Sequence, residues 1–101
     1  MKFHVLYADY CPWCQKLKNE MKEYNEAHRG EEIYFVLYDA QNRDHAHNWA
    51  NKFGEVVPRG YKYIPQVVLE ENNGNMVWIG GYEEFHNKYI VKRPRKKCGK
   101  M

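Results

Sequence analysis

The segment Cys11-Pro12-Trp13-Cys14 stands between an apolar run at residues 3–7 and a longer stretch of helix-forming residues. A helix that begins at the first cysteine would place its sulfur beside unpaired backbone N–H groups and the positive end of the helix dipole, which favour a thiolate. The thiolate is the reactive form in thiol–disulfide exchange, and a second thiol three residues later can displace whatever the first captures. A redox role for this pair therefore requires a strand before Cys11 and a helix that begins at it.

Strand-like and helix-like patterns follow one another along the chain. Apolar runs rich in β-branched and aromatic residues predict strands, and apolar residues at helical spacing predict helices. The expected strands cover residues 3–7, 33–38, 66–70 and 76–79, and the expected helices cover residues 13–28, 44–53 and 82–92. Asn73-Gly74 predicts a hairpin between the last two strands, and a helical crossover makes the first two strands parallel. The sequence thus predicts one α/β domain, residues 1–92, of order β-α-β-α-β-β-α, with a mixed four-stranded sheet flanked by three helices.

The basic charge is concentrated at the C-terminus. The formal net charge is +3, but residues 92–101 hold six of the 16 basic residues and no acidic residue, which leaves 10 basic against 13 acidic residues elsewhere. We interpret residues 93–101 as a basic tail, and we do not expect a nucleic-acid partner. The chain has no run of 18 apolar residues, and Met1 leads directly into a strand pattern. We expect a cytoplasmic monomer without a membrane partner.

The cysteine count of three is odd, which argues against a disulfide-stapled scaffold. A close cysteine pair between a strand and a helix indicates redox chemistry or metal binding instead. A zinc site would need two further ligands at suitable spacing, and Cys98 and the five histidines are scattered along the chain. We therefore expect a redox role and no bound metal, with a purely structural thiol pair as the alternative.

Three features in this order resemble the thioredoxin/glutaredoxin superfamily. The cysteine motif follows the first strand, Ile64-Pro65 opens the third strand, and the hairpin leads through Gly80-Gly81 into a last helix. The likeness covers residues 2–92 and implies a thioredoxin-like fold. It also implies that Pro65 is a cis-proline that lies against the cysteine sulfurs and presents the backbone of Ile64 to an extended substrate.

The residues resemble both branches of this superfamily, and we favour the glutaredoxin-like one. Pro12, Pro65-Gln66-Val67 and Ile79-Gly80-Gly81 are similar to glutaredoxins, whereas Ala8-Asp9-Tyr10 and Asn72-Asn73-Gly74 are similar to thioredoxins. Two positions depart from these families. Glutaredoxins commonly carry a basic residue where this chain has Ala8, and thioredoxins carry a buried Asp where it has Val5.

The resemblance implies a dithiol oxidoreductase that acts in cell redox homeostasis. Cys11 is the expected catalytic nucleophile, predicted to be exposed, and Cys14 is the expected resolving thiol that leaves a redox-active disulfide. Glutathione is the expected co-substrate, protein or glutathione mixed disulfides are the expected substrates, and no cofactor is expected to stay bound. The implied contacts for substrate or glutathione are Tyr10, Pro12, Trp13, Ile64, Pro65, Gly81, Tyr82 and Glu83.

Two alternatives to this function stay open. One is a thioredoxin-like electron donor to a specific protein that is recycled by a flavoenzyme rather than by glutathione, and Ala8 is the residue that keeps it open. The other is a redox-inactive binding module that docks a partner, against which the intact cysteine pair counts.

Overall fold

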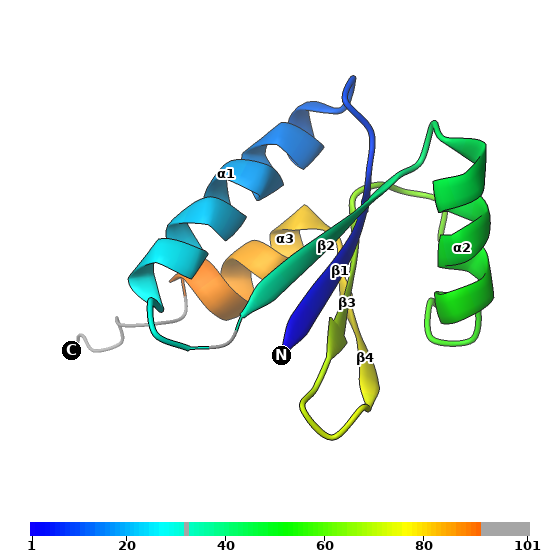
Figure 1. The fold of residues 1–101 in the computed structure, drawn as a ribbon. Helices are drawn as coiled ribbons and strands as arrows, with labels where there is room; N and C mark the ends of the chain where they lie inside the picture. The colour runs from blue at the N-terminus through cyan, green and yellow to red at the C-terminus, as the bar shows by residue number, and fades with distance from the viewer. Residues whose placement is uncertain (32, 92–101) are drawn as a thin grey trace.

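A computed structural model describes residues 1–31 and 33–91, so the predicted basic tail and Cys98 lie outside the described residues. Within the described residues a four-stranded sheet is covered by helices on both faces (Figure 1). The elements are β1 (Lys2–Tyr7), α1 (Pro12–Ala27), β2 (Tyr34–Asp39), α2 (Arg43–Phe53), β3 (Gln66–Glu70), β4 (Met76–Gly80), α3 (Tyr82–Phe85) and the π-helical segment η1 (His86–Val91). The predicted element order and thioredoxin-like α/β fold are confirmed.

The closing helix differs in detail from the prediction. Sequence spacing predicts one helix from residue 82, but the winding changes from α to π at His86. Phe85 and Tyr89, which pack toward the core, are four positions apart, and both windings bring such a pair to the same side. The apolar pattern therefore predicts a helix here without predicting its winding.

The sheet has the strand order β2-β1-β3-β4. Strands β1 and β2 run parallel, with Phe3 opposite Phe35, as the helical crossover predicts. Strand β3 runs antiparallel to both β1 and β4, and its register with β4 shifts between Val67 and Val68. The hairpin turns through Gly74, whose φ of +92° is a conformation that glycine adopts without strain. This order places the end of β1, which leads into the cysteine motif, beside the start of β3, which follows Ile64 and Pro65.

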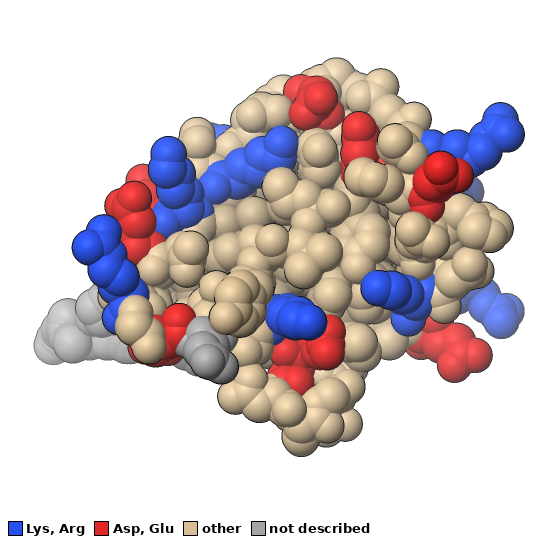
Figure 2. Space-filling model, in the orientation of Figure 1, with Lys and Arg blue, Asp and Glu red and all other residues tan. Residues whose placement is uncertain are grey.

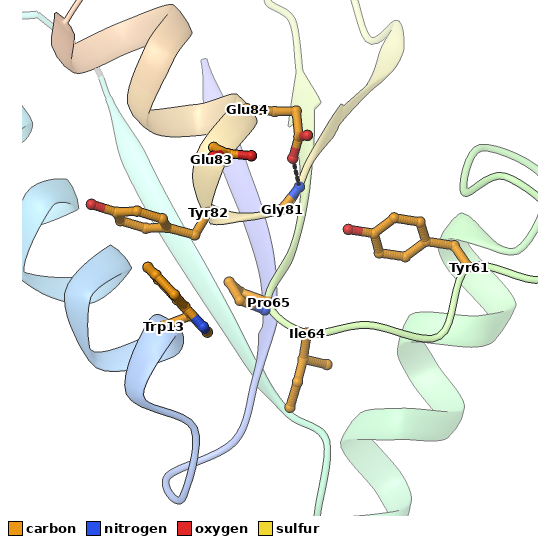
Figure 3. A pocket seen from close by; sticks show the side chains of 8 residues that line it. All are labelled: Trp13, Tyr61, Ile64, Pro65, Gly81, Tyr82, Glu83 and Glu84. Carbon is orange, nitrogen blue, oxygen red and sulfur yellow. Dashed lines mark hydrogen bonds between the residues drawn. The ribbon is translucent and has the colours of Figure 1, made fainter.

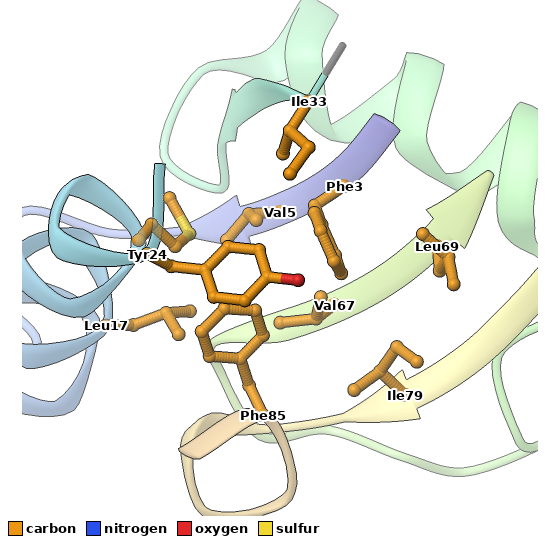
Figure 4. Packing of buried hydrophobic residues seen from close by; sticks show 10 residues of the cluster. Phe3, Val5, Leu17, Tyr24, Ile33, Val67, Leu69, Ile79 and Phe85 are labelled. Atoms are coloured by element: carbon orange, nitrogen blue, oxygen red, sulfur yellow. The ribbon is translucent and has the colours of Figure 1, made fainter. Parts of the chain in front are cut away.

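One face of the sheet packs against α1 and α3 around Phe3 (Figure 4). The Phe3 ring is stacked on Phe35 at 5.1 Å between centroids and meets Phe85 edge-on at 5.6 Å. Phe85 and Leu17 are fully buried in the same cluster. These contacts hold α1 and α3 against one sheet face, with the N-cap residues Cys11 and Gly81 at the candidate site.

The opposite face packs against α2 through Trp49 and Phe53, which the helical spacing predicts as the buried side. The buried His4 of β1 lies on this face, 3.1 Å from the Tyr38 hydroxyl and 2.8 Å from Glu70 Oε1. The hydrogen bond with His4 is the largest influence on Glu70 and lowers the pKa of its carboxyl. His4 is thus a partnered core residue.

The side of the molecule that carries the β2 edge mixes both signs of charge around a largely uncharged middle (Figure 2). Strand β2 contributes exposed apolar side chains there, since Tyr34 is 55% and Leu37 is 41% exposed. Interspersed charges of opposite sign produce only a weak net field at a distance. This face therefore lacks, among the described residues, the single-sign patch that attracts a polyanion.

Candidate active site

Cys11 is the N-cap residue of α1, directly after the turn that follows β1. Its backbone is extended, with φ of −92° and ψ of 115°, and Pro12 occupies the first helical turn, as predicted. The Cys14 N–H donates to the Cys11 sulfur at 3.4 Å. The sulfur thus takes the position of a capping acceptor, where the helix dipole and a backbone donor stabilise negative charge.

Cys11 is less accessible than predicted. An exposed nucleophile is expected from the sequence, but Cys11 is only 7% exposed. The reason is a contact made across the fold: Ile64, from the segment that enters β3, packs against the cysteines, and the Cys11 thiol points to the Ile64 carbonyl at 3.8 Å. A substrate sulfur therefore has to reach Cys11 next to the Ile64 backbone.

Cys14 has a different environment from Cys11. It is fully buried against Ala8, and both cysteines are free thiols. Burial raises the pKa of the Cys14 thiol to about 12, and the neighbouring Cys11 sulfur adds to the rise. A backbone hydrogen bond to Ala8 and the charge of Lys18 oppose it without cancelling it. At neutral pH Cys14 is therefore a protonated thiol held beside the more accessible sulfur.

The Ile64–Pro65 peptide bond is cis, which confirms the isomer that the resemblance implies. Pro65 is buried, and together with Gly81 it lies between the two sides of a surface groove (Figure 3). The backbone that precedes Pro65 is the part in contact with the Cys11 sulfur. The Ile64–Pro65 segment thus contacts the Cys11 sulfur and also lines the groove.

The groove has a volume of about 310 Å³. Its lining brings together six of the predicted contact residues from three distant segments: Trp13, Ile64, Pro65, Gly81, Tyr82 and Glu83. The other two predicted contacts, Tyr10 and Pro12, do not line it, and Tyr10 is 71% exposed. Two lining residues were missing from the predicted set, Tyr61 and Glu84.

Trp13 and Tyr82 form one wall of the groove, with their ring centroids 5.4 Å apart. The Tyr82 hydroxyl donates to Glu20 Oε2 at 2.8 Å, and burial, together with Glu20, raises the pKa of Tyr82 to about 12. His86 Nδ1 lies 2.9 Å from the same carboxylate. Lys16 Nζ lies 5.1 Å from the Trp13 ring centroid. Side chains of α1 and η1 therefore hold the Trp13 and Tyr82 rings in place.

Tyr61 stands at the other side of the groove, and Glu84 lies near Gly81, toward the same end as Glu83 (Figure 3). Glu84 Oε1 accepts a hydrogen bond from the Gly81 N–H at 2.7 Å, which caps the start of α3. The Tyr61 ring packs on Trp78 at 4.9 Å, and burial and the Glu84 charge raise the pKa of its hydroxyl. Glu84 could have been found from the spacing Gly-x-x-Glu before an apolar residue, which is a helix-capping pattern. Tyr61 carries no comparable signal.

In residues 1–31 and 33–91, no group of three or more His, Cys, Asp or Glu side chains is arranged to hold a metal ion. No helix in the same residues has the length and apolar character needed to span a bilayer.

Comparison with known proteins agrees with this geometry. Residues 2–90 match the family model described as a thioredoxin-like domain. A solved structure titled "Structure of a malarial protein" is similar in fold, with a TM-score of 0.52 and 21% identity over 89% of this chain and 97% of that one. No curated protein matches the chain. The family match spans nearly all the described residues, and the chain belongs to the thioredoxin-like domain family.

Proposed function

We propose that this protein is a thiol–disulfide oxidoreductase that reduces disulfides through Cys11 and Cys14. The observation that carries the proposal is the unequal environment of the two sulfurs. The Cys11 sulfur caps a helix and accepts a backbone N–H, whereas Cys14 is fully buried and its pKa is raised to about 12. Cys11 is thus suited to act as the nucleophile, whereas Cys14 remains a protonated thiol.

The reaction proceeds by two thiol–disulfide exchanges. The Cys11 thiolate attacks one sulfur of the substrate disulfide, the S–S bond breaks, and the departing sulfur leaves as a thiolate that takes a proton. Cys14 then loses its proton and attacks the Cys11 sulfur, which releases the second substrate thiol and forms the Cys11–Cys14 disulfide. Two electrons and two protons pass from the dithiol to the substrate.

The reductant that returns the Cys11–Cys14 disulfide to the dithiol has two candidates. Glutathione is favoured by the groove beside Cys11, which gathers six of the eight contacts implied by the glutaredoxin resemblance. A flavoenzyme of the thioredoxin-reductase type is favoured by Ala8, which stands where glutathione users commonly carry a basic residue. The groove supports this second candidate too, because none of its described lining residues is Lys or Arg.

Turnover of β-hydroxyethyl disulfide with glutathione and glutathione reductase separates these candidates. Rapid turnover supports glutathione, while turnover only with a thioredoxin-reductase-type flavoenzyme supports the other. The potential of the couple is a second measure, at roughly −200 to −230 mV for a glutaredoxin-like protein and about −270 mV for a thioredoxin-like one.

The proposed roles of the two cysteines are tested by serine substitutions. Cys11→Ser should abolish reduction of every disulfide, and activity retained in this variant would overturn the mechanism. Cys14→Ser should accumulate a mixed disulfide with protein substrates, visible by mass spectrometry, because the resolving thiol is missing. If the wild-type protein reduces no disulfide under any of these conditions, it is a binding module instead.

A further inference from the structure

We infer that the groove beside Cys11 selects polypeptide disulfides in which a Lys or Arg stands next to the reacting cysteine. This inference rests on the proposed function and names the substrate class of the same site. It follows from the charge of the groove, the aromatic walls on either side of it and the position of the groove relative to the nucleophile.

The charged groups that line the groove are all carboxylates. Of the eight lining residues, Glu83 and Glu84 are the charged ones, and both are exposed. Glu84 uses Oε1 to accept the Gly81 N–H. Within the described part of the chain, neither carboxylate has a Lys, Arg or His nitrogen within 4.0 Å. The groove thus presents two negative charges that no basic side chain of the described residues neutralises.

Two basic groups beside the Trp13 and Tyr82 wall, Lys16 and His86, have other contacts. Lys16 Nζ lies over the rings of Trp13 and Tyr82, at 5.1 and 5.8 Å from their centroids, and does not line the groove. The His86 ring faces Glu20, which also accepts the Tyr82 hydroxyl. His86 is therefore engaged with Glu20 and not with Glu83 or Glu84.

The aromatic walls suit the alkyl stem of a long basic side chain. Trp13 and Tyr82 stand on one side and Tyr61 on the other, with the two glutamates toward one end (Figure 3). Such rings pack against methylene groups and attract a cation to their faces, as Lys16 shows with Trp13 and Tyr82. A Lys or Arg can therefore lie along the walls while its head group approaches the carboxylates.

The site of attack sets which residue of the substrate enters the groove. Cys11 touches the Ile64 carbonyl, and Ile64 and Pro65 belong to the groove lining. A peptide whose cysteine reaches Cys11 passes along this backbone, so the residue beside its cysteine meets the groove. An acidic residue in that place would face Glu83 and Glu84 with like charge, and the same repulsion acts on the carboxylates of oxidised glutathione.

The test uses three quenched fluorescent peptide disulfides that are identical except for Arg, Gln or Glu beside the cysteine. The protein is reduced beforehand and freed of reductant, and a Cys98→Ser background removes the third thiol. Rates are measured under single-turnover conditions, so no recycling system is needed. We expect the order Arg, Gln, Glu, with the Arg peptide faster than the Glu peptide by about fivefold at low salt, and a smaller ratio at about 1 M salt.

Variants at Glu83 decide whether the groove causes this order. Glu83→Gln should reduce the Arg-to-Glu rate ratio, and Glu83→Lys should bring it to one or below. The matched control is Glu55→Lys, an equal change of charge at an exposed residue just after α2 that does not line the groove, and it should keep the wild-type ratio.

Each outcome bears on one of the two proposals. Equal rates for the three peptides overturn the charge inference and leave the oxidoreductase intact. A preference for Arg that Glu83→Lys leaves unchanged, or that Glu55→Lys removes as well, also overturns the inference, because the groove is then not its source. If no peptide is reduced faster than in the Cys11→Ser variant, the proposed function itself is wrong.

Discussion

Cys14 should resist alkylation at neutral pH even when the protein is fully reduced. The perturbation is a pulse of iodoacetamide at pH 7, applied to the dithiol protein in a Cys98→Ser background. Alkylation proceeds through the thiolate, so its rate follows the fraction of the thiol that is ionised. The alkylation rates of Cys11 and Cys14 are then compared within one protein.

The expected size of the effect follows from the raised pKa of Cys14. Its pKa rises from an ordinary value of 9.0 to about 12, chiefly because the thiol is buried. Three units correspond to about 4 kcal/mol between the thiol and the thiolate. At pH 7 the ionised fraction falls from about one in a hundred to about one in a hundred thousand, so ionisation alone slows the reaction about a thousandfold.

Peptide mapping by mass spectrometry after timed pulses measures both cysteines, and the urea-unfolded protein supplies the reference rate for each. In the folded protein Cys11 should be modified first and Cys14 should stay unmodified over the same period. A Cys14 rate within about tenfold of its unfolded reference would refute the reasoning. The Cys11→Ser variant tests the cause: Cys14 should stay slow there, because burial is the largest contribution, and a fast reaction would show that the Cys11 sulfur dominates.

Two further predictions concern stability. Gly80→Ala should lower the free energy of unfolding by about 2–3 kcal/mol, because φ is +124° and an added Cβ would lie 2.7 Å from the Glu84 side chain. Gly60→Ala is the control, with φ of +84° and open space around an added Cβ, and should cost about 1 kcal/mol. Equal losses of the two variants in urea denaturation would contradict a steric clash at Gly80. The hydrogen bond with His4 lowers the pKa of Glu70, so its stabilisation is complete above the ordinary value of 4.5 and is lost as the pH falls through the lower folded value. Glu70→Gln should therefore show a shallower fall in Tm below pH 4.5 than the wild type. If Tm fell equally with pH in both proteins, the stabilising role of the Glu70–His4 hydrogen bond would be contradicted.

Most of the fold could be predicted because its signals are local. Leu17, Met21 and Tyr24 fall on one face of a helix by spacing alone, and they do form the buried side of α1. The hairpin depends on one glycine in the turn, and β3 has the predicted bounds. Each of these features is decided by neighbours within a few positions, which a single sequence displays.

The features that sequence reasoning missed depend on contacts between distant segments. Cys11 was expected to be exposed, but Ile64, 53 residues later, covers it. His86 belonged to no recognisable cluster, yet it meets Glu20, 66 residues earlier. Tyr61 carries no local signal of a groove residue, and the conformation of its loop places it in the groove lining. No local pattern encodes such pairings, because either partner could have met another residue.

The two properties of the site arise from different parts of the fold and should be separable by mutation. The inequality of the sulfurs depends on the start of α1 and the burial of Cys14 among Ala8 and Ile64. The charge of the groove depends on the first turn of α3, where Glu83 lies at the surface. A change at Glu83 should therefore alter which disulfides are reduced and leave the alkylation pattern of the cysteines as it is. If Glu83→Lys changed both, the groove and the sulfurs would have to be electrostatically coupled, and neither could be assigned a role alone.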